Sequence, residues 1–269
     1  MDSKFSLDLV GGKINFILYG VDELLTNIII PEIKKEGERL QKIFDFYDSD
    51  SELSKLNRGR EMIVSDELLN VLETALNFCR LTAGKYDVSF GKLFLARKSG
   101  KSLPLIACSY EDISINKNKV SLKHDDVLID LGSIAKGYIG DRLAEKLKEL
   151  GVKSALIDAR GEVIIFGEVS EKIGIQNPRG DGIMREIVLK NSAVATSGDY
   201  SQYNKDYEHS HIISGTNVSS ATVVANSLML ADVLASVVFV CEEKVYKEIL
   251  EKYKIQDYFV IDKNSKVVH

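Results

Sequence analysis

The sequence predicts one α+β domain spanning residues 1–269. Several short stretches alternate apolar and polar residues, which is the period of a strand. Others repeat apolar residues every three or four positions, which is the period of an amphipathic helix. The two kinds of segment are interspersed without a regular strand–helix–strand order, and no low-complexity linker divides the chain. This arrangement favours an α+β fold over a parallel α/β fold.

The first predicted elements are a hairpin and a long helix. Residues 5–20 largely alternate apolar and polar side chains, and Gly11-Gly12 marks the bend. From Asp22 onward, apolar residues follow at helical steps as far as Phe44. Pro31 either kinks this helix or marks its true start, because proline lacks the N–H that a helix interior needs.

The next predicted helix covers residues 66–83, with Asp66 as its cap and Gly84 as its stop. Further along the chain, periodicity and turn residues predict a hairpin over 113–122, helices over 133–150, 229–241 and 243–253, and strands over 153–158, 162–167, 172–176, 184–190, 221–226 and 258–268.

Composition excludes several classes of protein. With 40 acidic and 35 basic residues, the formal net charge of −5 offers no basic face for nonspecific nucleic-acid binding. No run approaches the ~18–20 apolar residues of a membrane span. The N-terminus has no apolar signal region, and Cys79, Cys108 and Cys241 lack metal-type spacing. We expect reduced, buried thiols and a cytoplasmic protein, unless a leader has been removed.

Residues 130–138 read Asp-Leu-Gly-Ser-Ile-Ala-Lys-Gly-Tyr, where an apolar strand over 127–131 runs through a glycine turn into a helix. Free N–H groups at a helix N-terminus attract anions, and Lys136 adds a positive charge. The segment matches neither the P-loop nor the dinucleotide fingerprint, so a nicotinamide oxidoreductase is not indicated. An ordinary strand-to-helix turn and a phosphate site are both open interpretations.

Asp232 lies within an otherwise apolar helical stretch. A buried carboxylate is unfavourable unless it is paired or binds a metal. Ser236 follows four residues later and therefore lies on the same helix face. Two oxygen donors on one face suit a hard cation such as Mg²⁺. The alternative is that Asp232 caps the helix.

Three other polar segments have structural interpretations when each is taken alone. Residues 47–59 read as a loop with a helix cap at Ser51 and a stop at Asn57–Gly59, and residues 84–91 read as a turn. Residues 195–203 read as a small-residue turn that, with His209 and His211, could line a cleft. A histidine metal pair is conceivable there, but no third ligand has suitable spacing.

Taken together and in this order, these segments resemble the ApbE family of FAD:protein FMN transferases. The resemblance covers about Leu9 to Val240. Residues 130–138 match with Ser133 in place of a glycine, and residues 195–200 match unchanged. The other matching segments are Tyr47 with Asp50-Ser51 and Ser54–Asn57, Gly84–Asp87, His211–Ile213 and residues 231–236.

The resemblance implies a fold of antiparallel sheets with packed helices and a site in a cleft between lobes. It also implies Mg²⁺-dependent transfer of FMN from FAD to a Thr or Ser hydroxyl of a target flavoprotein, with release of AMP. FAD would place its pyrophosphate near Asp130 and Lys136. The Ser133 carbonyl and the Asp232 and Ser236 side chains would hold the metal.

The remaining site residues follow from the same resemblance. His211 is the candidate for activating or orienting the acceptor hydroxyl, and Lys136 is the second candidate catalytic residue. The residues expected to contact the flavin or adenine end of FAD are Val10, Tyr47, Lys85, Tyr86, Asp87 and Ile213.

The sequence departs from the family pattern at three places. Val10-Gly11-Gly12 replaces Met-Gly-Thr, and Arg160-Gly161-Glu162 replaces Gly-Gly-Asp/Asn. After Ile213 the usual Asp-Pro-x-Thr-Gly becomes Ser-Gly-Thr-Asn, and His211 lies only 21 residues before Asp232. Two alternatives therefore stand beside transfer: an FAD pyrophosphatase that makes FMN and AMP, and a degenerate FAD-binding protein.

Overall fold

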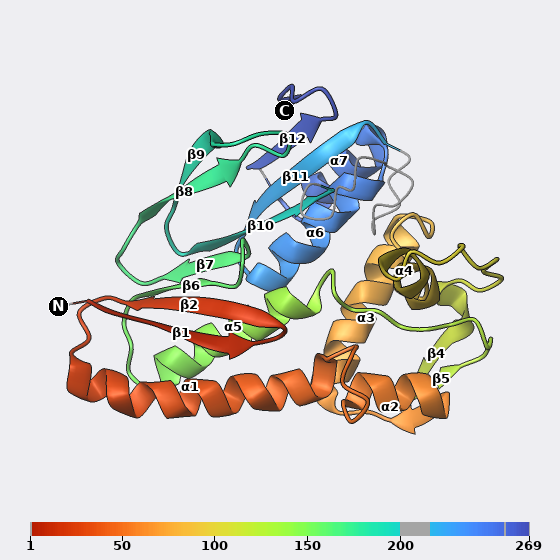
Figure 1. Cartoon of the computed structure of the whole chain (residues 1–269), viewed down its shortest axis with the longest axis horizontal. Helices are drawn as coiled ribbons and strands as arrows, with labels where there is room; N and C mark the ends of the chain where they lie inside the picture. The colour runs from red at the N-terminus through yellow and green to blue at the C-terminus, as the bar shows by residue number, and fades with distance from the viewer. Residues whose placement is uncertain (1, 200–215, 256, 269) are drawn as a thin grey trace.

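The computed structural model describes residues 2–199, 216–255 and 257–268 (Figure 1). Within them, a seven-stranded sheet forms the centre of the fold, and all its neighbouring strands are antiparallel. In order across the sheet, the strands are β1 (Ser3–Leu9), β2 (Gly12–Leu18), β6 (Ala155–Asp158), β7 (Val163–Phe166), β10 (Ser192–Gly198), β11 (Val218–Ala225) and β12 (Tyr258–Asp262).

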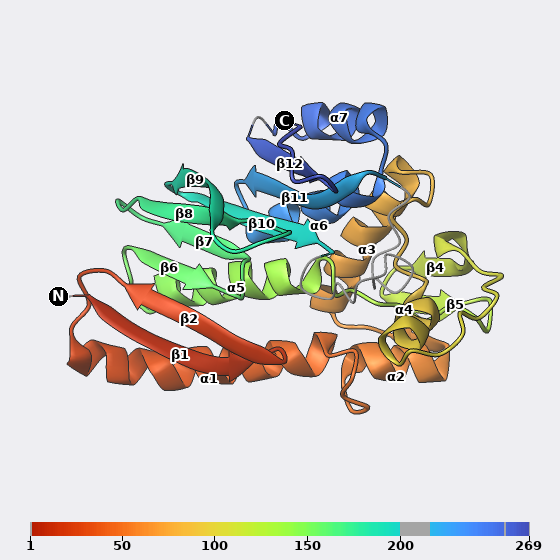
Figure 2. The same ribbon diagram turned by 45° about the horizontal axis from the view of Figure 1, so that its top comes forward.

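Helices cover one face of this sheet (Figures 1 and 2). They are α1 (Glu23–Phe44), α5 (Ala135–Glu149) and α6 (Leu228–Val240), with α7 (Glu243–Lys252) packed outside α6. The apolar α6 lies against β10 and β11, and α5 lies between α6 and α1. The hairpin of β8 (Glu171–Gln176) and β9 (Ile183–Leu189) covers part of the other face through a separate apolar cluster.

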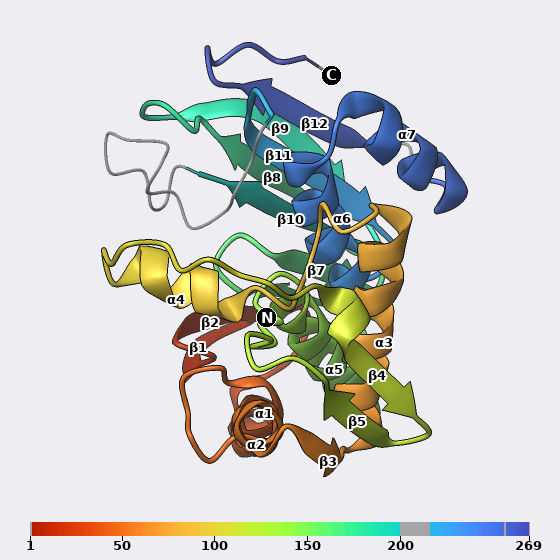
Figure 3. The same ribbon diagram turned by 90° about the vertical axis from the view of Figure 1, so that its right-hand side faces the viewer.

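A second group of elements lies at one end of the sheet (Figure 3). It contains α2 (Glu52–Gly59), α3 (Asp66–Leu81), α4 (Gly91–Lys98), a 3₁₀ turn (Tyr110–Asp112), and a small sheet of β3 (Glu61–Ile63), β5 (Lys119–Leu122) and β4 (Ile113–Asn116). One continuous buried cluster runs from this group into the helical layer of the main sheet. No helix of the described residues is long and apolar enough to cross a membrane.

The α+β prediction, with antiparallel sheets and packed helices, is confirmed. Asp22 caps α1 by accepting the Leu25 N–H at 2.8 Å, and the helix runs through Pro31, so a start at Pro31 is wrong. The predicted cap at Asp66 is also wrong. Ser65 performs this role and accepts the Leu68 N–H at 3.2 Å. The single-domain boundary and the cleft between lobes stay predictions.

Three local predictions differ from the structure. The expected turn beginning at Ala195 is instead the second half of β10, because these small side chains fit in the sheet beneath α6. Residues 127–131 are extended but form only an isolated bridge, Phe90 with Leu128. Asp232 does not cap its own helix, because Ser227 accepts the Leu230 N–H there.

The contact between α5 and α6 is unusually close. A Cβ added at Gly137 would lie 2.5 Å from the Leu228 carbonyl oxygen, and one at Gly140 would lie 2.5 Å from Leu228 Cδ2. Each helix also caps the other. Asp141 of α5 accepts the N–H groups of Leu228 and Met229 at 2.7 and 2.9 Å.

In return, Asp232 of α6 accepts the Gly137 N–H at 3.0 Å. Because carboxylates stabilise helix N-termini, the two helices fix each other's first turns.

We expect Gly137→Ala to destabilise the fold by about 1–3 kcal/mol, because its methyl group would meet backbone atoms that cannot rotate away. Gly59→Ala is the matched control. Gly59 ends α2 with open space around it, so alanine should be neutral or stabilising there. Denaturant unfolding measures both variants. Equal stabilities would contradict the close crossing.

Candidate functional site

The N-terminal halves of α5 and α6 bring the central predicted residues together. Lys136 lies in the first turn of α5, and Asp232 lies in the second turn of α6. The negative charges of the Glu162 and Asp232 carboxylates both raise the pKa of the Lys136 ammonium group. Glu162 follows the tight turn between β6 and β7, so three separate segments of the chain meet at one charged cluster.

Lys136 and Glu162 form an ion pair through Nζ and Oε1. Burial acts to lower the pKa of Lys136, but the Glu162 and Asp232 carboxylates outweigh it and the pKa is raised. Burial raises the pKa of Glu162 to about 7, with Lys136 acting in the opposite direction. Glu162 Oε2 is buried without a hydrogen-bond partner among the described residues. This oxygen is therefore available to a ligand or a proton.

Asp232 is buried, with 4 % of its surface exposed. Burial raises the pKa of its carboxyl group, and the Lys136 charge counteracts that rise. Among the described residues, the only hydrogen bond to this carboxylate comes from Gly137, at Oδ2. The Gly137 N–H is thus already hydrogen-bonded. It is therefore not one of the free N–H groups that the predicted phosphate site at this helix N-terminus would use.

Two hydroxyl pairs flank this cluster. The Tyr86 hydroxyl lies 2.8 Å from Ser133 Oγ, and Ser236 Oγ lies 3.0 Å from Ser197 Oγ of β10. Burial raises the pKa of Tyr86 well above its ordinary value, and Asp232 adds to the rise. Tyr86 is therefore a neutral donor at the site.

Asp130 stands just before the α5 turn. Its Oδ1 accepts the Gly132 N–H at 2.8 Å, and burial raises the pKa of its carboxyl group while Lys98 lowers it. Lys98 of α4 also donates to the Tyr47 hydroxyl at 2.8 Å and lies 4.2 Å from the centre of its ring. Lys98, which the sequence did not point to, thus contacts Tyr47, and its charge also acts on Asp130.

The other two members of the 85–87 segment lie apart from this cluster. Asp87 accepts the N–H groups of Ser89 and Tyr110 at 2.8 and 2.9 Å, as expected for the structural interpretation of a turn. Lys85 is exposed, and its charge acts on Cys241 beyond the end of α6. Predicted catalytic residue His211 and predicted FAD contact Ile213 lie outside the described residues.

Asn57 positions the approach to Asp130. Its Nδ2 donates to the Ile129 carbonyl at 2.9 Å, and its Oδ1 accepts the Ile129 N–H at 2.8 Å. This buried amide holds Ile129, whereas its neighbours Leu128 and Asp130 hydrogen-bond to the backbone of residues 88–91. The segment Asn57–Gly59, predicted as the end of a helix, thus also holds the backbone next to Asp130. The sequence does not show this, because the contact joins residues that are far apart in the chain.

Glu162 is a charged residue of the cluster to which the sequence motifs gave no role. Its only signal in the sequence was the replacement of the usual Gly-Gly-Asp/Asn by Arg160-Gly161-Glu162. Its partner, Lys136, lies 26 positions away, so no local pattern predicts the ion pair.

The donors around Asp232 fit a hard cation. A carboxylate, a nearby serine hydroxyl on the same helix and a turn carbonyl are the oxygen ligands that Mg²⁺ prefers. In the described ranges no three His, Cys, Asp or Glu side chains form a metal group.

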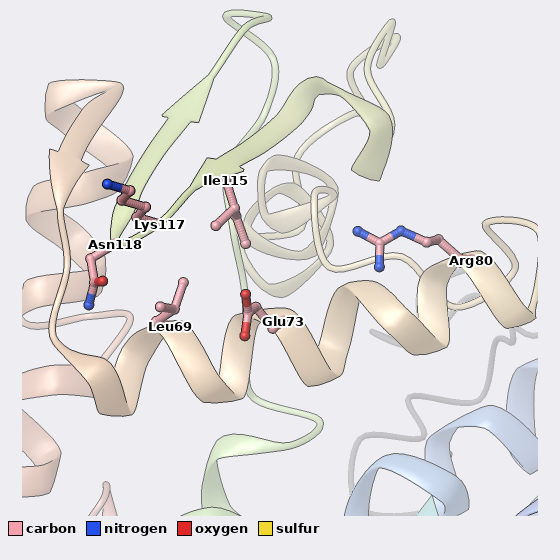
Figure 4. A pocket seen from close by; sticks show the side chains of 6 residues that line it. All are labelled: Leu69, Glu73, Arg80, Ile115, Lys117 and Asn118. Atoms are coloured by element: carbon pink, nitrogen blue, oxygen red, sulfur yellow. The ribbon is translucent and has the colours of Figure 1, made fainter.

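One cavity formed by described residues lies elsewhere. It has a volume of about 440 Å³ and lies between α3 and the β4–β5 hairpin (Figure 4). Its lining residues are Leu69, Glu73, Arg80, Ile115, Lys117 and Asn118. None of them belongs to the charged cluster, so this cavity is not the predicted site.

Comparisons with known proteins agree with the resemblance. The model of the ApbE family matches residues 1–259. A relative from Haemophilus influenzae named FAD:protein FMN transferase is 28% identical over 94% of this chain and 86% of its own length. A relative of the same name from Vibrio cholerae is 29% identical over 79% of this chain and 73% of its own.

A solved structure, flavin transferase ApbE from Vibrio cholerae, superimposes with a TM-score of 0.83. The match covers 99% of this chain and 96% of that chain at 25% identity.

The raised pKa of Glu162 predicts a pH-dependent contribution to stability. The folded protein holds this proton more tightly than the unfolded chain, whose carboxyl group titrates near 4.5. Relative to Glu162→Gln, the wild type should therefore lose stability between pH 4.5 and about 7, by on the order of 1–3 kcal/mol. Urea unfolding of both proteins across that range measures the difference. A wild type that gains stability relative to Glu162→Gln as the pH rises would contradict the assignment.

Proposed function

The chain belongs to the ApbE family, and from that premise we propose that it transfers FMN from FAD to a Thr or Ser hydroxyl of an acceptor flavoprotein. The curated relatives that match most of its length are named for this activity. The observation that carries the proposal is the cluster of Asp232, Lys136 and Glu162 at the α5–α6 crossing. Buried, pKa-shifted groups that converge in this way are typical of functional sites.

In this proposal, FAD binds with its pyrophosphate beside Lys136, at the N-terminal end of α5. A pyrophosphate oxygen competes with Glu162 for the ammonium group, and the helix N-terminus adds further attraction. The Asp232 and Ser236 side chains and the Ser133 carbonyl would hold Mg²⁺. When bound, this ion neutralises charge on the pyrophosphate.

The reaction is a displacement at phosphorus. The acceptor oxygen forms a bond to the FMN-side phosphorus, and the bond from that phosphorus to the bridging oxygen breaks. AMP leaves with that bonding electron pair, and the hydroxyl proton passes to a base. His211 is the proposed base. Such reactions depend mainly on positioning and charge stabilisation, which a fixed helix crossing provides.

The flavin and adenine ends of FAD would extend beyond the cluster and contact further residues. Tyr86 is the buried donor nearest to Ser133, and Tyr47 offers an exposed ring that Lys98 holds in place. Val10 lies in the β1–β2 turn next to the β6–β7 turn that carries Glu162. Lys85, Asp87 and Ile213 complete the proposed set.

We also propose a cytoplasmic location. Cys79, Cys108 and Cys241 are all buried and unpaired. Burial raises the pKa of the Cys241 thiol to about 11. Unreactive, reduced thiols of this kind suit a reducing compartment.

The test of function is incubation with FAD and Mg²⁺, with and without a peptide that bears a candidate Thr acceptor. We expect AMP together with an FMN-sized gain in peptide mass. AMP without peptide modification, across several acceptor peptides, would favour the pyrophosphatase. Bound FAD without AMP would favour the degenerate binder and would point to the altered sequence after Ile213.

Substitutions at the proposed metal ligands give a sharper prediction. Asp232→Asn keeps the hydrogen bond from Gly137 but removes the charge, so AMP release should fall at least about 100-fold. Ser236→Ala should also lower it, whereas Ser236→Thr keeps the hydroxyl and should retain it. Initial rates of AMP formation at saturating FAD measure all three. A fully active Asp232→Asn variant would rule out this ligand set.

A further inference from the structure

Two neighbouring turns next to the charged cluster have residue types that are unusual for their backbone conformation. Strands β1 and β2 are joined by Val10 and Gly11, with φ of +53° and +73°. Strands β6 and β7 turn through Arg160 and Gly161, with φ of +67° and +102°. Positive φ at both central residues defines a type I′ turn, whose first position favours Asn, Asp or Gly. Neither Val nor Arg is favoured there.

The arginine of one turn holds the backbone of the other. Arg160 Nη2 donates to the Val10 carbonyl at 2.8 Å, and Nη1 donates to the Gly11 carbonyl at 3.1 Å. Its side chain lies flat across Gly12, where an added Cβ would be 2.6 Å from Nη1 and 2.8 Å from Cδ. The pairing of β2 with β6 brings the two turns to the same end of the sheet.

A second side chain binds the N–H group of Val10, whereas Arg160 binds its carbonyl group. Gln41 of α1 accepts the Val10 N–H through Oε1 at 3.0 Å. Both backbone polar groups of Val10 are thus bound by side chains from distant elements. A β-branched residue in the left-handed region is strained and persists only where its surroundings fix it.

The location of this turn gives it a role. Arg160 is two residues before Glu162, the partner of Lys136, and the turn lies at the end of the sheet where α5 begins (Figures 1 and 2). Arg160 is exposed, and its charge reaches Lys136. A rigid backbone edge beside the pyrophosphate subsite would limit how FAD enters.

We infer that Arg160 is a positioning residue, which locks the Val10–Gly11 turn in the shape that receives FAD. This inference rests on the proposed function. The lock consists of two hydrogen bonds from one guanidinium group, and it does not require Arg160 to touch FAD. Only a planar fork reaches both carbonyls, so lysine cannot replace it.

The test measures FAD affinity by titration calorimetry without Mg²⁺, so that turnover does not interfere. Arg160→Gly removes the fork and suits the left-handed backbone, so folding should be preserved. Gly12→Ala displaces the same fork while keeping its charge. We expect each variant, and Arg160→Lys, to raise the Kd for FAD about tenfold. The Gly12→Ala/Arg160→Gly double variant should bind no more weakly than either single variant.

The matched control is Lys117→Gly. Lys117 is also a cationic residue with positive φ in a hairpin turn, between β4 and β5 and away from the cluster. Its replacement should leave the Kd for FAD unchanged. Thermal unfolding of every variant separates positioning from stability, because the inference requires a change in Kd at a nearly unchanged Tm.

Several outcomes would overturn the inference. Wild-type affinity in Arg160→Gly would show that the lock does nothing for FAD. Wild-type affinity in both Arg160→Lys and Gly12→Ala would show that charge alone matters. These results would leave the proposed function intact. A wild-type protein that binds no FAD at all would instead overturn the proposed function and this inference with it.

Discussion

The crossing of α5 and α6 is the constraint on which the rest of the site depends. Glycine at 137 and 140 lets the helices approach until the Leu228 carbonyl nearly touches the α5 backbone. The first turn of each helix then donates backbone N–H groups to a carboxylate of the other helix. Asp141 caps α6, and Asp232 caps α5. Burial raises the pKa of Asp141 to about 6, although two N–H groups stabilise its charged form. The crossing therefore brings the Asp232 carboxylate, which lies in an apolar helix, within hydrogen-bond distance of the α5 backbone.

A carboxylate fixed in this way needs a counter-charge, and the chain supplies it from the same turn. Lys136 is adjacent to Gly137, whose N–H binds Asp232, and the ion pair with Glu162 orients the Lys136 ammonium group. Glu162 then enters from the β6–β7 turn and makes a three-charge cluster with net charge −1 when both carboxylates are ionised. In a medium of low polarity such a cluster favours a proton or a cation. Burial is the main cause that raises the pKa of Glu162 to about 7, and the Asp232 charge adds to it, so this carboxyl group holds a proton more readily than an exposed glutamate does.

The sequence predicted most elements because their patterns are local. The alternation in residues 5–20 and the apolar steps from Asp22 need no tertiary information, and Ser51 caps its helix as expected. The strand at Ser192–Gly198 was missed because its small residues have little strand propensity, and its burial comes from α6. The site residues also fall into those that a local pattern predicts and those that depend on tertiary contacts. A carboxylate in an apolar helix stands out by itself, whereas the Lys136–Glu162 pair and the Asn57 amide act across 26 and 72 positions.

The described β-branched residue with positive φ, Val10, lies beside the proposed site. Several described non-glycine residues have positive φ, and most are polar or small residues in ordinary turns, such as Lys117 and Asn191. Val10 is different, because a β-branched side chain is the least suited to that region. It is held from both sides, by Gln41 and Arg160, and lies beside the turn that delivers Glu162. A looser turn with Asn-Gly would be more stable locally. The chain instead keeps a less stable turn whose shape is set by its neighbours, which is the expected trade where a binding edge must be rigid before its ligand arrives.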